Sequence, residues 1–166
     1  MVGKPSAPQY LRWLDVPISF DRSDHPSHIP RPKKYPLVVS PIVDNVKLSR
    51  VFVDGGSIIN ILILEAFDRM GLSRSALWPC AEPFHGIVPG TTSVPVGQIT
   101  LLVIFGTKEN FRTEHIRFEV VDFSTAYNAF LGRPALTKFM AIPHYTYLVL
   151  KMSGPQGVIS VKGDVK

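Results

Sequence analysis

Apolar runs along the chain alternate with turn residues at short intervals, a pattern that predicts a mostly β protein with short helices. The segment 37–43 is strand-like, and Asp44-Asn45 forms a turn before a second apolar run at 46–54. These two runs predict a hairpin. After it, apolar residues recur at helical spacing between Ile61 and Met70, and Gly71 stands where a helix C-cap belongs.

The second half of the chain continues with short apolar segments. They predict strands at 84–88, 92–96, 99–105, 111–112 and 116–121. In the last of these, apolar residues at 116, 118 and 120 alternate with their neighbours, which is typical of a half-exposed strand. A closing hairpin is predicted from Tyr145–Met152 and Val158–Val161, around a Gly-Pro-Gln-Gly turn.

One arrangement occurs twice. An apolar strand, a glycine-containing turn and a short helix are found at 51–71 and again at 129–141. Pro134 stands in the first turn of the second helix, where proline is favoured. Of the two copies, the first alone carries an acid, Asp54, in its turn. The repeat predicts a small barrel built from two similar halves.

The most informative stretch is Arg50–Ser57, an apolar run that ends on Asp54 and continues into two glycines and a serine. A carboxylate at the end of a buried strand is desolvated, so it needs a partner or a raised pKa. Gly55 and Gly56 let backbone or a ligand come close where a Cβ would clash. Two interpretations stay open: a chemically active carboxylate, or an ordinary turn whose Ser57 caps the following helix.

Length and composition predict one domain with a core and extended ends. The chain has 166 residues, of which 45% are hydrophobic, and seven of its 15 prolines fall within the first 36 positions. We therefore expect an extended, partly disordered leader at 1–34, a folded domain at 35–162 and a tail at 163–166. Trp13 and Phe20 are the leader residues suited to dock onto the domain.

Charge and residue types exclude several classes of function. Residues 1–50 hold 8 Lys+Arg against 4 Asp+Glu, and the other 116 hold 10 against 9, so the folded part is nearly neutral. Nucleic-acid binding through this segment is not expected. No apolar run approaches the roughly 18 residues of a membrane span, and no signal pattern is present, so we expect no membrane partner and a cytoplasmic location. A lone Cys80 and scattered histidines predict neither a disulfide framework nor a metal or cofactor.

Three ordered motifs resemble the retropepsin family of aspartic proteases, specifically the protease segment of plant gypsy-class LTR retrotransposon polyproteins. The motifs are Val51-Phe52-Val53-Asp54-Gly55-Gly56-Ser57, Pro83-Phe84-His85-Gly86-Ile87-Val88 and Ala129-Phe130-Leu131-Gly132-Arg133-Pro134. Residues 20–26 are also similar to the leader that precedes the domain in such polyproteins, and the resemblance covers about residues 18–162. It implies an all-β, retropepsin-like fold with short helices, a small closed β-barrel of two pseudo-symmetric halves.

The resemblance also assigns roles to residues. Asp54 matches the catalytic aspartate, and Leu131-Gly132 matches the motif that packs beneath the active-site loop. The segment 84–96 matches the flap hairpin that closes over a bound peptide. The candidate substrate-binding residues are Gly56, Ser57, His85 and Gly86. Gly55 departs from the family, which usually has Thr or Ser there, with a hydroxyl that cross-links the two active-site loops.

Peptide hydrolysis of this type needs two carboxylates within about 3 Å that share one proton. This chain offers one suitable acid, because its other acidic residues fall in turns or on polar faces. We therefore expect a homodimer with one Asp54 from each chain, acting as an endopeptidase on a peptide or polyprotein. The alternative is a catalytically inactive retropepsin-like fragment that serves as a dimerisation or peptide-binding module, and Gly55 favours it.

Overall fold

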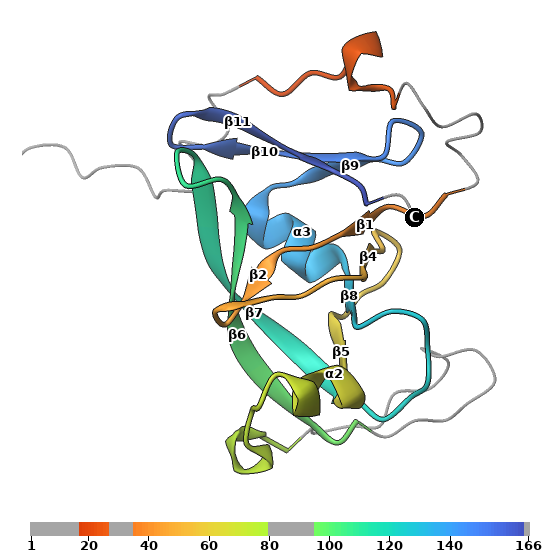
Figure 1. The fold of residues 1–166 in the computed structure, drawn as a ribbon, viewed down its shortest axis with the longest axis vertical. Coiled ribbons are helices and arrows are strands. Elements are labelled where there is room, and N and C mark those ends of the chain that lie inside the picture. The colour runs from red at the N-terminus through yellow and green to blue at the C-terminus, as the bar shows by residue number, and fades with distance from the viewer. Residues whose placement is uncertain (1–16, 27–34, 80–94, 165–166) are drawn as a thin grey trace, which may run out of the picture.

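The computed structural model describes residues 17–26, 35–79 and 95–164, which fold mostly into β-strands (Figure 1). The strands are β1 Val38–Val39, β2 Ile42–Val43, β3 Val46–Lys47, β4 Val51–Val53, β5 Ile61–Ile63, β6 Gly97–Gly106, β7 Phe111–Val121, β8 Ala129–Leu131, β9 Ile142–His144, β10 Val149–Gly154 and β11 Gly157–Lys162. The helices are α2 Leu64–Arg69 and α3 Arg133–Phe139, with single 3₁₀ turns η1 Arg22–Asp24 and η3 Arg74–Ala76. This architecture confirms the expected fold class.

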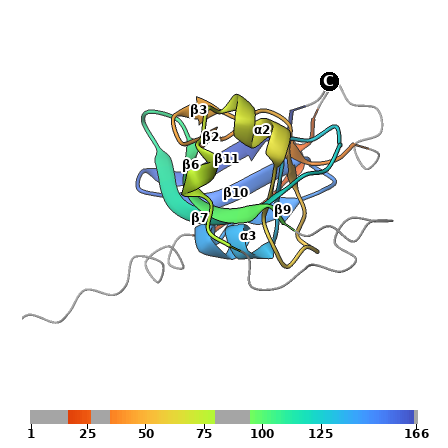
Figure 2. The same cartoon turned by 90° about the horizontal axis from the view of Figure 1, so that it is seen from below.

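The strands form two sheets. The larger has eight strands in the order β1-β4-β8-β5-β7-β6-β2-β3, and the smaller has three in the order β11-β10-β9. The smaller sheet lies across one end of the molecule (Figure 1). Helix α3 lies beside β7, on one side of the molecule (Figure 2). Among the described residues, no helix is long and apolar enough to cross a membrane.

The longest element is the hairpin of β6 and β7, which pair from Gly97↔Val120 to Gly106↔Phe111. The separate strands predicted at 111–112 and 116–121 are therefore one strand. The polar residues between them continue the alternation, because Thr113 and His115 are exposed while Glu114 is half-buried and pairs with Arg112, and a ladder needs only their backbone. The predicted strand at 84–88 lies outside the described residues, and that at 92–96 overlaps them only at 95–96.

The helix expected from Ile61 onward begins later than predicted. Residues 61–63 form β5, which pairs with β7 and β8, and α2 starts at Leu64. Leu62 packs in the main core while Ile61 and Ile63 pack in a second cluster with Val121, so this run is buried on both faces. A short run that is apolar on both faces fits a strand inside a sheet as well as a helix, and periodicity cannot separate the two.

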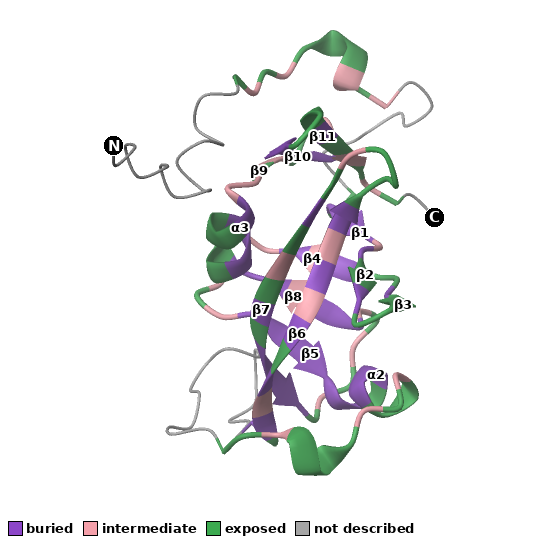
Figure 3. Cartoon of the chain, turned by 90° about the vertical axis from the view of Figure 1, so that its left-hand side faces the viewer, coloured by how far each residue is buried: buried purple, intermediate pink, exposed green. Residues whose placement is uncertain are grey.

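The two copies of the repeated arrangement lie side by side. β4 and β8 are parallel neighbours, with Phe52 opposite Phe130 and Val53 opposite Leu131. In the second copy the turn leads directly into α3, with Pro134 in its first turn as predicted. In the first copy β5 stands between the turn and its helix. These central strands are mostly buried (Figure 3).

The closing hairpin forms from β10 and β11, but its first strand begins at Val149, because residues 145–148, predicted as strand, form the turn from β9 to β10. β9 adds to the free side of β10. Arg112 of β7 is buried beside it and donates hydrogen bonds to the carbonyls of Phe139, at 2.7 Å, and Ser153, at 3.1 Å. Burial lowers the pKa of the Arg112 guanidinium. This side chain ties the larger sheet to the end of α3 and to the smaller sheet.

Residues 17–26 lie along the outer face of the smaller sheet (Figure 1). The ammonium of Lys151 bonds the carbonyl of Ser19 and the carboxylate of Asp24, both at 2.8 Å. The hydrogen bond from Lys151 lowers the pKa of the Asp24 carboxyl group. The same ammonium lies 5.0 Å from the ring centre of Phe20, so Phe20 docks as expected. Trp13 lies outside the described residues, and the domain boundaries stay predictions.

Candidate active site

Asp54 lies on a tight turn at the end of β4. Its N–H donates to the carbonyl of Leu131 at 2.8 Å, and its carbonyl accepts from the N–H of Ser57 at 3.2 Å. One carboxylate oxygen, Oδ1, accepts from the N–H of Gly56 at 3.1 Å. The other, Oδ2, accepts no hydrogen bond from a described residue. The half-buried carboxylate is therefore fixed at one oxygen and open at the other.

The turn after β8 packs against the Asp54 turn. The N–H of Arg133 donates to the carbonyl of Ser57 at 2.8 Å. A Cβ on Gly132 would lie 2.1 Å from the carbonyl oxygen of Ile59 and 2.9 Å from that of Ser57. Backbone packs against backbone here, so position 132 has room for hydrogen alone. Leu131-Gly132 thus lies where the resemblance places it, against the loop that carries the acid.

Asn60, which the sequence interpretation missed, links the two turns. Its buried Oδ1 accepts from the N–H of Gly132 at 2.8 Å and from that of Ala135 at 3.3 Å, and its Nδ2 donates to the carbonyl of Arg117 at 3.1 Å. These two N–H groups belong to the start of α3, which has no side-chain cap of its own. An asparagine inside an apolar run was the available signal, since a buried amide requires partners.

Ser57 does not cap the following helix, which corrects one of the two interpretations. Its hydroxyl donates to the carbonyl of Ile59 at 2.8 Å and accepts from the N–H of the same residue at 3.3 Å. The N-cap of α2 is Ile63, which offers no side-chain hydrogen bond. The proposed substrate-facing residues His85 and Gly86 lie outside the described residues. The substrate-binding role of Gly56 and Ser57 stays a prediction.

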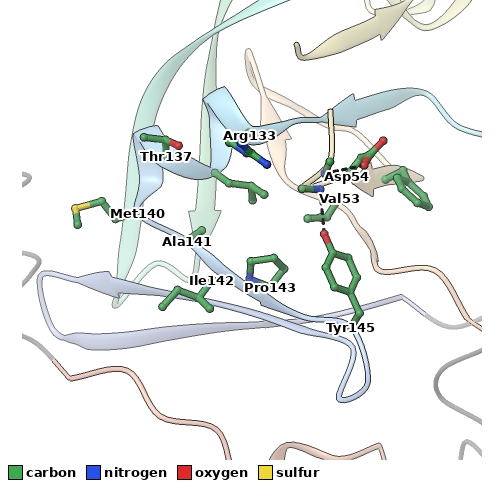
Figure 4. Close-up of a pocket in the computed structure, with 13 residues that line it drawn as sticks. Val53, Asp54, Arg133, Thr137, Met140, Ala141, Ile142, Pro143 and Tyr145 are labelled. Atoms are coloured by element: carbon green, nitrogen blue, oxygen red, sulfur yellow. Dashed lines mark hydrogen bonds between the residues drawn. The ribbon is translucent and has the colours of Figure 1, made fainter. Parts of the chain in front are cut away.

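A hollow lies on each side of the Asp54 turn. The first, which we call the Phe130 pocket, has a volume of about 720 Å³ and is lined by Phe52, Asp54, Gly56–Ile59, Ile61, Ile63, Val121, Phe123, Thr125, Tyr127 and Phe130. The second, the Tyr145 pocket, has a volume of about 910 Å³ and is lined by Phe52–Gly56, Arg133, Leu136, Thr137, Met140–Pro143 and Tyr145 (Figure 4). Among these lining residues Asp54 is the single acid.

The Phe130 pocket is apolar beside the carboxylate. The rings of Phe52, Tyr127 and Phe130 contact one another with centres 5.1 to 5.9 Å apart. Ile58 is 76% exposed at its rim. Aromatic and aliphatic walls of this kind suit an apolar side chain of a bound ligand.

The Tyr145 pocket has a different wall. Tyr145 reaches from the turn between β9 and β10, and its phenol oxygen accepts from the N–H of Gly55 at 3.0 Å (Figure 4). Arg133 lies at the start of α3 in the same wall and makes no ion pair with a described residue. In the part of the chain that the structure describes, no group of three or more His, Cys, Asp or Glu side chains could hold a metal ion.

Comparison with known proteins finds similar structures. No family model and no curated protein sequence matches the chain. The retroviral protease-like domain of Ddi1 from Leishmania major matches with a TM-score of 0.59 and 18% identity, over 78% of this chain and 94% of that chain. A retropepsin-like aspartic protease from Rickettsia conorii follows at 0.48 and 17%, over 75% and 80% of the two chains. EIAV protease complexed with an inhibitor follows at 0.47 and 15%, over 72% and 92%.

The class that this architecture defines is the retropepsin-like fold, on the strength of the Leishmania domain. Among the described residues that line the Phe130 and Tyr145 pockets, the one acid, Asp54, lies on the turn after β4, beside a glycine turn from the second copy of the repeat.

Proposed function

We propose that the chain is an aspartic endopeptidase domain that works as a homodimer, with one Asp54 from each copy. One observation carries the proposal. Asp54 is the single acid among the described residues around the two pockets, and its Oδ2 is open. A retropepsin-like fold with half of a carboxylate pair needs a second copy to complete it.

The chemistry divides between the two carboxylates. They share one proton, because two like charges at about 3 Å cannot both ionise. The ionised carboxylate takes a proton from a water molecule while the oxygen of that water adds to the peptide carbonyl carbon. The protonated carboxyl group gives its proton to the carbonyl oxygen. The C–N bond then breaks as the carboxyl group that took the proton from water gives it to the leaving amine, and a hydroxyl of the intermediate returns a proton to the other carboxylate.

Other residues of the chain hold this arrangement. The N–H of Gly56 fixes Oδ1, which leaves Oδ2 toward the second copy and the water. The Phe130 pocket accepts an apolar substrate side chain next to the carboxylate. Asn60 and Gly132 hold the Asp54 turn against the turn that follows β8. Preorganisation of this kind lowers the cost of reaching the transition state.

The finer parts of the proposal concern origin and substrate. We infer a retroelement source of the plant gypsy class, a polyprotein substrate and a cytoplasmic setting. The support is the ordered set of motifs around Asp54, at 83–88 and at 129–134. The retropepsin-like fold is compatible with this inference.

The test is cleavage of a peptide library and of a denatured protein between pH 3 and 7. We expect cleavage at acidic pH that falls as both carboxylates ionise, and that Asp54→Asn lowers by about a thousandfold or more. Asp44→Asn is the matched control, since Asp44 is exposed on the β2–β3 turn and asparagine tolerates its positive φ of 50°. Unchanged cleavage in Asp54→Asn would refute the proposal.

A second candidate is a catalytically silent dimerisation or peptide-binding module. Gly55 favours it, because the position after the acid carries no hydroxyl and its N–H already bonds within the chain. Two measurements separate the candidates. Sedimentation of the wild-type protein reports whether it forms dimers, and a binding assay reports whether it binds the same peptides. Dimers that bind peptide but cleave none at any pH would favour the module.

A further inference from the structure

We propose that Tyr145 is a positioning residue for Asp54, and that its phenol occupies within one chain the place of the hydroxyl that position 55 lacks. This inference rests on the proposed function for its catalytic consequence. The contact itself is independent of activity. Tyr145 stands 90 positions after Gly55, in the turn between β9 and β10 of the smaller sheet.

The geometry at Gly55 carries the inference. Its N–H donates to the phenol oxygen of Tyr145 at 3.0 Å. A Cβ on Gly55 would also lie 3.0 Å from that oxygen, closer than most real contacts of this kind, and 3.8 Å from Leu136 Cδ1. A threonine or serine at position 55 would therefore crowd the phenol of Tyr145, which would have to move by a few tenths of an ångström to make room. Glycine at this position and tyrosine at 145 fit each other.

The turn that presents Tyr145 is held on several sides. The rings of His144 and Tyr147 stack with centres 4.0 Å apart and planes 8° apart, and the N–H of Tyr147 donates to His144 Nδ1 at 3.0 Å. Phe20, from the segment 17–26, contacts His144 with 5.2 Å between the ring centres. These contacts restrict the turn, so the phenol is positioned at little further entropic cost.

A consequence for assembly follows. Since the N–H after Asp54 is bonded within its own chain, the Asp54 turn has its shape before a second copy binds. The same N–H is then no longer a donor for a link between two chains. Other surfaces must supply the contacts that hold the dimer, and the role of Tyr145 is to fix the carboxylate.

The first experiment measures the contact without any substrate. Tyr145→Phe removes the oxygen alone, and Tyr147→Phe is the matched control, because the phenol of Tyr147 bonds no described residue. In ¹⁵N–¹H spectra of the full chain we expect Tyr145→Phe to shift the Gly55 amide and speed its hydrogen exchange about fivefold. Tyr147→Phe should leave both unchanged. An unaltered Gly55 amide in Tyr145→Phe would overturn the inference.

The second experiment measures the consequence. In the cleavage assay, Tyr145→Phe should lower kcat about tenfold with KM unchanged, since it loosens the acid and leaves the pockets intact. Gly55→Thr should lower kcat by displacing the phenol, and Gly55→Thr combined with Tyr145→Phe should recover most of that loss. If Tyr145→Phe shifts the Gly55 amide while kcat stays at the wild-type value, the positioning role is overturned. Absence of cleavage by the wild-type protein would instead refute the proposed function, while the amide measurement still decides the contact.

Discussion

The turns that follow β4 and β8 are alike in position and differ in how tightly they are enclosed. Both follow short buried strands that lie parallel and in register. A Cβ on Gly132 in the second turn would overlap backbone at 2.1 Å, whereas a Cβ on Gly56 in the first would meet only Asp54 Oδ1, at 3.5 Å. The second turn packs against the backbone of the first, and the first borders the two pockets. Two equivalent strands therefore lead into turns with different surroundings.

The largest effect on stability is expected from the enclosed turn. Gly132→Ala forces a methyl into the backbone of residues 57–59, which no rotamer can relieve, so the Asp54 turn must move. We expect a loss of about 3 kcal/mol in the free energy of unfolding, measured by urea denaturation. The φ of Gly132 is −90°, so the loss would reflect space and not backbone conformation. A loss below about 1 kcal/mol would mean that the two turns are not tightly packed.

A smaller effect is expected from the side chain that joins the turns. Asn60 is 4% exposed, and Asn60→Ala leaves the N–H groups of Gly132 and Ala135 and the carbonyl of Arg117 without this partner. We expect a loss of about 2 kcal/mol in the free energy of unfolding. Circular dichroism during urea denaturation measures it.

The matched control for that variant is Asn110→Ala. Asn110 also bonds backbone through both ends of its amide, to Gly157 and Gln156, but in an exposed pair of hairpin turns far along the chain from Asp54. Water can replace those bonds, so its loss should be below about 1 kcal/mol. Equal losses in the two variants would remove the special role given to Asn60.

Local signals predicted much of the fold and part of the site. The hydrophobic run before Asp54, the proline at the start of α3 and the Gly-Pro-Gln-Gly turn between β10 and β11 each act within a few residues. The elements they predict are present, although the run at 46–54 is two strands, β3 and β4, that are separated at residues 48–50 and lie apart in the sheet. The repeat also predicted that residues 51–53 and 129–131 play equivalent parts, and they pair in register.

The features that escaped prediction depend on distant partners. β5 was expected as helix, because its partners β7 and β8 lie more than 50 residues away in the chain and periodicity does not report them. Asn60 left a signal, a polar residue in an apolar run, but not the identity of its partners. Tyr145 left none, since its contact with Gly55 spans 90 residues and needs the smaller sheet to be in place.

The smallest effect on stability is expected from Gly56→Ala, which completes the comparison with Gly132→Ala. The added methyl meets Asp54 Oδ1 at an ordinary contact distance of 3.5 Å, and Gly56 is exposed. The free energy of unfolding should therefore change by less than about 0.5 kcal/mol. Cleavage should fall about tenfold or more, because the methyl lies beside the reacting carboxylate where a substrate must approach. A stability loss as large as that of Gly132→Ala would show that the first turn is as enclosed as the second, and wild-type cleavage would place the substrate elsewhere.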